Sequence, residues 1–162
     1  MITQEYLKEI LTYDEETGIF KWNVSRCNVK IGSTAGKTRK DGYVVIGIDK
    51  KHYLSHRLAW VYKYGEFPKR FLDHIDGNPS NNKISNLREA NDSENAFNTK
   101  IRNDNTSGYK GVDFLKSNNK YRARLRINKK EIHLGLFDDL ELAQLVVSEA
   151  RLKYCKNFAR DK

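Results

Sequence analysis

An adjacent aspartate and histidine, Asp73 and His74, precede a run of residues dense in Asp, Asn and Gly. Hydrolysis of a phosphodiester requires a nucleophilic water, stabilisation of charge at the phosphate, and help for the departing 3′ oxygen. A divalent cation can supply the last two, and a neutral histidine can activate the water. Mg²⁺ prefers oxygen ligands and usually keeps several waters beside one or two protein ligands. An Asp–His pair is common by itself, but with the asparagines that follow, it indicates metal-assisted phosphodiester hydrolysis.

The polar segment at residues 71–100 reads FLDHIDGNPSNNKISNLREANDSENAFNTK. Asn, Asp and Gly often only turn the chain, and we interpret five of these residues as loop formers: Asp76, Gly77, Asn78, Asn81 and Asn82. His56 lies beside apolar residues near a helix start and is interpreted as structural, whereas Arg57 is a candidate phosphate contact. The sequence GSTAGKT at residues 32–38 has three residues between its glycines, where a phosphate-binding loop needs four, so we interpret it as a turn.

Short strands and helices are expected to position this segment. Residues 71–74 predict a strand, a return strand begins at Leu87, and a helix begins near Asp92 or Ser93. Upstream, the predicted elements are a helix over residues 4–11 capped by Thr3, a turn at residues 16–18 between two extended runs, a hairpin at residues 43–54, and a helix from residue 56 that Gly65 and Pro68 close.

The last third of the chain predicts a three-stranded antiparallel sheet backed by one helix. Extended runs at residues 109–115, 120–128 and 131–137 follow a polar stretch. The helix over residues 140–155 has apolar residues at helical spacing, which we expect to face the sheet: Leu142, Leu145, Val146, Ala150 and Leu152.

The middle run of this sheet, KYRARLRIN, alternates strictly between two kinds of residue. Arg122, Arg124 and Arg126 point to one face, and Tyr121, Ala123, Leu125 and Ile127 point to the other. The apolar face is expected to pack on the helix. The arginine face would then be flat and charged, and a sheet of this width can lie in the DNA major groove. A solvated charged face is the alternative.

Charge and composition favour two small modules with a polyanionic partner. The 162 residues carry a formal net charge of +9, and only 38% of them are hydrophobic. Residues 101–162 hold 14 basic and 8 acidic side chains, so the excess is largest there. The two cysteines, Cys27 and Cys155, form no CxxC pair, so no structural zinc is expected. Without a signal peptide or a long apolar run, the chain is expected in the cytoplasm, that of a bacterial host if it is phage-encoded.

The polar segment resembles the HNH homing endonucleases common in phage genomes. The matching text is HRLAWV, LDHIDGNPSNNKISNLREAN and SEN, within residues 43–98. The resemblance implies a ββα-metal fold in which His74 is the general base and Asp73 a metal ligand. It places the middle Asn of the motif on Asn86, which would hold the loop and orient His74, and a second metal ligand on Asn95. The implied cofactor is one Mg²⁺ or Mn²⁺ per active site.

The C-terminal segment resembles the AP2 DNA-binding domain, through GYKGV, YRARL, HLGLF and a helix with Ala143 and Ala150. Transfer of that family's sheet contacts suggests these DNA-facing residues: Lys110, Asp113, Arg124, Arg126, Glu131 and His133. Arg122 joins them by alternation. Several Arg or Trp positions of the plant domain differ here, including Asp113 and Glu131, so the target sequence does not follow from the resemblance.

Together these features predict an α+β chain with an HNH nuclease module at residues 1–100, a linker at 101–107 and an AP2-like module at 108–162. The expected function is site-specific, homing-type cleavage of double-stranded DNA, with no membrane and no small-molecule cofactor. With one nuclease site per chain, a monomer would nick one DNA strand, whereas a weak dimer could cut both DNA strands. One alternative is a DNA-binding regulator with an inactive HNH fold; another is an RNA-binding protein, although no aromatic stacking platform is evident.

Overall fold

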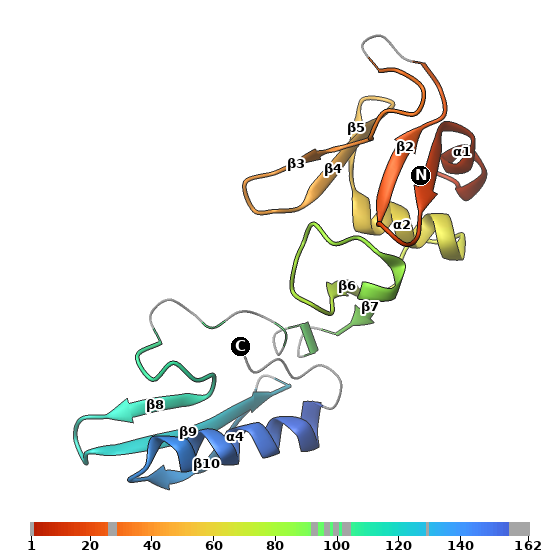
Figure 1. Ribbon diagram of the computed structural model, residues 1–162. Helices are drawn as coiled ribbons and strands as arrows, with labels where there is room; N and C mark the ends of the chain where they lie inside the picture. The colour runs from red at the N-terminus through yellow and green to blue at the C-terminus, as the bar shows by residue number, and fades with distance from the viewer. Residues whose placement is uncertain are drawn as a thin grey trace. The chain divides into compact units, whose positions relative to one another are not determined.

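The computed structural model describes residues 2–25, 29–91, 94–95, 98, 101, 105–128 and 130–155. The chain is of the mixed α+β class that the sequence predicts, and it divides into two compact units, Met1–Ala90 and Asn91–Lys162 (Figure 1). Within the described residues, no helix is long and apolar enough to cross a membrane.

The first unit opens with a helix and two hairpins, as expected. Helix α1 (Gln4–Ile10) begins after Thr3, whose hydroxyl accepts a hydrogen bond from the Tyr6 N–H. Antiparallel strands β1 (Leu11–Asp14) and β2 (Ile19–Trp22) follow it. The next strands form a three-stranded antiparallel sheet in the order β3 (Lys37–Thr38), β4 (Val44–Ile48) and β5 (Lys51–Leu54).

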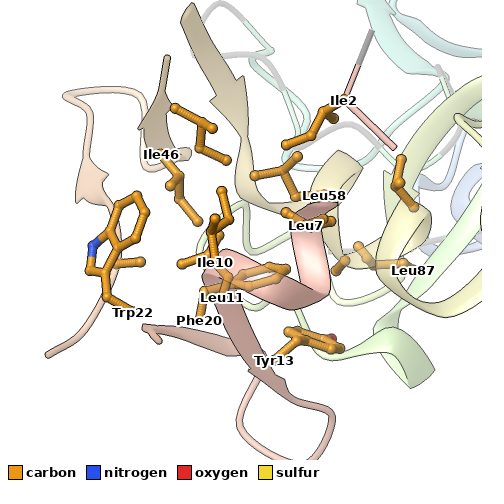
Figure 2. Packing of buried hydrophobic residues seen from close by; sticks show 14 residues of the cluster. Ile2, Leu7, Ile10, Leu11, Tyr13, Phe20, Trp22, Ile46, Leu58 and Leu87 are labelled. Atoms are coloured by element: carbon orange, nitrogen blue, oxygen red, sulfur yellow. The ribbon is translucent and has the colours of Figure 1, made fainter. Parts of the chain in front are cut away.

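One apolar core joins these elements to helix α2 (Ser55–Tyr64). The helix ends at Gly65, which has a φ of 84°, a conformation that favours glycine. The largest fully buried side chains of the unit come from α1, α2 and the strands (Figure 2): Leu7, Leu11, Phe20, Ile46, Ile48, Leu58 and Val61. This core supports the residues that follow α2.

Strands β6 (Phe71–His74) and β7 (Leu87–Ala90) pair antiparallel, with the short 3₁₀ helix η1 (Ile84–Asn86) before β7. The strand and its return at Leu87 are therefore confirmed. The predicted helix start at Asp92 or Ser93 lies outside the described residues. The flanking residues Asn91 and Glu94 form two reciprocal hydrogen bonds. The Asn91 N–H donates to Glu94 Oε2 (2.7 Å), and the Glu94 N–H donates to Asn91 Oδ1 (2.9 Å), as at a helix N-terminus.

The second unit contains a three-stranded antiparallel sheet with a helix packed on it. The strand order is β10 (Lys130–Phe137), β9 (Lys120–Ile127), β8 (Val112–Leu115), and the helix is α4 (Leu140–Cys155). Ala123 and Leu125 of β9 are buried, so the predicted apolar face of this strand is confirmed. Ala123 packs with Val112, Ala143 and Val147 in a shared cluster.

The predicted buried face of α4 is wrong for its three leucines, whereas Ala150 packs against the buried Leu125 as expected. Leu142, Leu145 and Leu152 are 48%, 53% and 64% exposed, while Ala143 and Val147 are buried. The physical reason is close packing: a Cβ at Gly111 would come within 3.0 Å of Val147 Cγ1. Alanine, glycine and valine let the helix lie close to the sheet, and bulkier leucines on that face would hold it away.

Candidate active site

Asp73 and His74 occupy the buried end of β6. The register of the β6–β7 ladder places Asp73 opposite Arg88. Arg88 Nε and Nη2 both donate to Asp73 Oδ2, at 3.0 and 2.9 Å. Both side chains are largely buried, so the guanidinium compensates the carboxylate charge and fixes its orientation. A carboxylate that could bind a metal ion thus directly precedes the candidate base in β6.

The ring of His74 has an amide partner from the following loop. His74 Nε2 lies 3.2 Å from Oδ1 of Asn82, which is 2% exposed. Sequence reasoning treated Asn82 as a loop former. The signal that separates it from Asn81 is burial, because the Asn81 side chain instead bonds to Asp76.

Asn86 ties the loop together at its base. Its Nδ2 donates to Asp76 Oδ1 (3.0 Å) and to the Asn81 carbonyl (2.9 Å), and its Oδ1 accepts from the Asp76 N–H (3.1 Å). Partial burial raises the pKa of Asp76, but hydrogen bonds from Asn81, the Asn78 N–H and Asn86 outweigh it and lower the pKa overall. These bonds are of the loop-holding kind expected of Asn86, while its orienting role toward His74 stays a prediction.

Three aromatic rings, one of them that of His74, pack against one another in the site. The ring centroids of His56 and His74 are 5.0 Å apart, and Tyr43 lies 5.5 Å from His56 and 5.9 Å from His74. Burial, and to a lesser extent His74 and Arg57, lower the pKa of His56 to about 3. None of the described residues hydrogen-bonds the buried His56 Nδ1. His56 is therefore a neutral ring packed edge-on against the candidate base, a contact that the sequence did not reveal.

Arg57 and Asn95 are the remaining candidate residues outside the C-terminal sheet. Arg57 is half-buried, and its guanidinium carbon lies 5.6 Å from the centroid of the Phe67 ring. Asn95 is half-buried and belongs to the second unit, where its N–H donates to the Asn91 carbonyl at 2.9 Å. Asp73, His74 and Asn86 all belong to the first unit.

On the C-terminal sheet, acids pair with the aligned arginines. Arg122 Nη2 and Arg124 Nε lie 2.8 and 2.9 Å from the two carboxylate oxygens of Asp113. Arg124 Nη1 also lies 2.9 Å from Glu131 Oε2. We call these four residues the arginine ladder; it spans strands β8, β9 and β10. Among the other candidate DNA contacts, Arg126 and His133 are exposed, and Lys110 is half-buried.

The donor atoms at Asp73 suit a hard cation. Among the described residues, no group of three or more His, Cys, Asp or Glu side chains is gathered as a metal site, so a zinc-type ligand set is not seen there. The single Asp73 carboxylate matches a cation that keeps most of its waters and takes one or two protein oxygens. These residues therefore fit Mg²⁺ or Mn²⁺.

Comparison with known proteins places the chain in a family. The model of the HNH endonuclease family matches residues 53–97, which include Asp73, His74 and Asn86. The chain is 35% identical over 97 residues to Protein 3.8 of Escherichia phage T7, covering 59% of this chain and 80% of that protein. It is 34% identical over 87 residues to the "SPbeta prophage-derived putative HNH homing endonuclease YosQ" of Bacillus subtilis (strain 168), covering 47% of this chain and 50% of that protein. No solved structure gives a significant match. From the buried Asp–His pair and these matches, we conclude that the chain belongs to the HNH endonuclease family.

Proposed function

We propose that this protein is a site-specific DNA endonuclease of the homing type, which hydrolyses phosphodiester bonds with His74 as general base and one divalent metal ion. The observation that carries the proposal is the pairing of Asp73 and His74 at the buried end of β6, inside the matched segment at residues 53–97. The carboxylate is held by Arg88 and the imidazole lies by Asn82, so both groups have defined partners.

His74 would remove a proton from water as the water oxygen forms a bond to phosphorus. The bond from phosphorus to the 3′ oxygen breaks, leaving a 5′-phosphate and a 3′-hydroxyl after the 3′ oxygen is protonated by solvent. The neutral His56 ring beside His74 adds no charge to this corner. Arg88 keeps the Asp73 carboxylate in place throughout.

HNH nucleases generally use a divalent metal ion. Asp73 would hold it, and Asn95 is the second ligand that the family resemblance implies. A bound Mg²⁺ or Mn²⁺ would stabilise the charge that develops at the scissile phosphate and on the leaving oxygen. The buried Asp73 carboxylate supports this assignment.

The C-terminal sheet would bind the DNA. The exposed face of this sheet carries the arginine ladder. Arg126 and His133 are also exposed, and the strand register places Arg126 opposite Glu131 and His133 opposite Arg124. Lys110 and, in the first unit, Arg57 are further proposed contacts. Guanidinium groups recognise phosphates and guanine edges, and the net charge of +9 favours duplex DNA as a partner.

Cleavage of supercoiled DNA tests the proposal. Plasmids that carry the genomic region around the protein's own gene are incubated with the protein and Mg²⁺, Mn²⁺ or EDTA. We expect nicked or linear products with either metal and none with EDTA, and ends that DNA ligase rejoins because they carry 5′-phosphates. Cleavage that persists in EDTA would contradict the metal assignment. Tight binding of the same region without cleavage would favour a DNA-binding regulator.

A further inference from the structure

The orientation of the Asn82 amide identifies the nitrogen of His74 that carries the proton. Asn82 Nδ2 donates to the Ser80 carbonyl at 3.2 Å, which turns Oδ1 toward the His74 ring. His74 Nε2 lies 3.2 Å from that oxygen. An amide oxygen accepts hydrogen bonds and cannot donate them, so the ring nitrogen facing it must be the donor. In the neutral imidazole the basic nitrogen is then Nδ1.

Asn82 is in turn fixed by the β1–β2 hairpin. The Tyr13 hydroxyl donates to the Asn82 carbonyl at 2.7 Å, in a buried hydrogen bond between residues 69 positions apart. Burial and, next, the Glu15 carboxylate raise the pKa of Tyr13, so this group stays a hydroxyl donor.

The turn of the same hairpin leaves no space beside the Asn82 backbone. Gly18 has a φ of 73°, and a Cβ there would lie 2.5 Å from the Asn82 carbonyl carbon and 2.4 Å from the Lys83 nitrogen. Only glycine fits this conformation and this contact. The hairpin and the loop therefore touch backbone to backbone at the residue that faces the His74 ring.

We propose that Asn82 is a positioning residue that keeps the proton of His74 on Nε2 and makes Nδ1 the base, and that the β1–β2 hairpin holds Asn82 for this purpose. The catalytic meaning of this role rests on the proposed function, in which His74 activates water. The hairpin, which precedes the segment that matches the HNH family, thereby helps to position the base. Asn82 differs in this role from Asn81 and Asn86, whose side chains bond to Asp76.

Nitrogen NMR of the imidazole rings tests the proposal without any cleavage. Long-range ¹H–¹⁵N spectra of the metal-free protein are recorded at about pH 8.5, roughly two units above the ordinary histidine pKa of ~6.5. His74 is identified among the four histidines by its loss in His74→Ala. We expect wild-type His74 to be protonated on Nε2. A wild-type ring protonated on Nδ1 would overturn the proposal, whatever the variants do.

The variants separate an orienting role from a general effect on the loop. Asn82→Ala is expected to convert the single tautomer of His74 into a mixture, while Asn82→Asp, which retains an oxygen acceptor, restores Nε2–H. Asn81→Ala is the matched control: it removes a neighbouring loop hydrogen bond and should leave the tautomer unchanged. An unaltered tautomer in Asn82→Ala, or the same mixture in Asn81→Ala, would overturn the role of Asn82. A wild-type spectrum in Tyr13→Phe would overturn the part played by the hairpin.

Activity gives the second readout. If the protein cleaves DNA, Asn82→Ala should lower kcat by about 10- to 100-fold, the usual effect of losing a group that orients a histidine ligand or base, with little change in KM. Rescue by Asn82→Asp supports the proposal, and an unchanged kcat overturns it. Because the tautomer is read from metal-free protein, failure of the endonuclease assignment would leave the NMR result intact.

Discussion

The Asp73–Arg88 ion pair decides how firmly the candidate metal ligand is held. Both side chains are largely buried, so removal of either one takes away the opposite charge that lies next to the other in a poorly solvated site. The pair also links strands β6 and β7, because Asp73 and Arg88 lie opposite each other in the pairing of these strands. This one ion pair therefore affects both the stability of the fold and the position of the candidate metal ligand.

We expect Arg88→Met to lower the free energy of unfolding by about 3 kcal/mol, the low end of the cost of breaking a buried ion pair. Arg70→Met is the matched control, because Arg70 is exposed and its replacement should change stability by less than about 0.5 kcal/mol. Urea unfolding followed by circular dichroism measures both. Equal stability of the two variants would show that the ion pair is not needed by the fold.

His56 predicts a pH dependence of stability. Burial lowers its pKa to about 3 in the folded protein, below the ordinary value of ~6.5. The unfolded chain therefore binds a proton that the folded one does not, so the contribution of His56 is complete above about pH 6.5. It is lost progressively as the pH falls toward 3, by at most about 1.4 kcal/mol per pH unit.

His56→Phe should flatten the stability profile between about pH 6.5 and 5, a range above the ordinary carboxylate pKa values. His52→Phe, at an exposed histidine, is the control and should retain the wild-type slope. Urea unfolding at several pH values measures the slope. A His56→Phe profile that remains as steep as that of the wild type would contradict a neutral His56.

At the scale of elements, helix α4 has two apolar stripes, and the structure buries the one with small residues. Val147→Ala is expected to cost about 2 kcal/mol, from two lost methyl groups and the cavity they leave. Leu145→Ala, on the exposed stripe, should change stability by no more than about 0.5 kcal/mol. Hydrogen exchange of α4 amides in the full chain measures both. The reverse order would mean that the leucine stripe faces the sheet.

The arginine ladder predicts how acids on the sheet tune DNA binding. Asp113→Asn removes the carboxylate that pairs with Arg122 and Arg124, so Arg122 gains freedom to bind phosphates and Arg124 keeps only its pair with Glu131. We expect tighter binding to non-cognate DNA and a steeper salt dependence, by about 0.9 in log–log slope for each added phosphate contact. Fluorescence anisotropy at several salt concentrations gives both quantities.

Asp138→Asn is the control for the change in net charge, since Asp138 pairs only with Lys120 among the ion pairs of the described residues. Its effect on binding should be clearly smaller than that of Asp113→Asn. Equal effects would assign the change to net charge alone and would remove the ladder from the DNA-binding surface.

In the second unit, the alternation of residues in β9 predicted its buried face correctly, whereas helical spacing did not identify the buried face of α4. The two-residue period of KYRARLRIN admits one division into faces, and the buried Ala123 and Leu125 lie on the expected side. Helical spacing fits both the leucine stripe and the Ala143–Val147 stripe, so packing against the sheet decides between them. Adjacent Asp73 and His74 could be found in the sequence, whereas the difference between Asn81 and Asn82 depends on the loop backbone and on the distant Tyr13.

At the scale of the whole molecule, the chain combines two compact units with different chemistry. The first contains the buried Asp–His pair, and the second contains a sheet whose exposed face has alternating arginines and acids. The excess positive charge is largest in residues 101–162. We therefore expect cleavage and binding to be separable by single substitutions, because Asp73 and His74 belong to the first unit and most of the residues proposed to bind DNA belong to the second.

A direct comparison of wild type with His74→Ala tests the central claim. Both proteins are assayed on the same supercoiled DNA with Mg²⁺, and their affinity for that DNA is measured in parallel. We predict that His74→Ala binds with wild-type affinity and cuts at least about 100-fold more slowly, the usual contribution of a general base. Wild-type cutting by His74→Ala would contradict the assignment of His74 as the base.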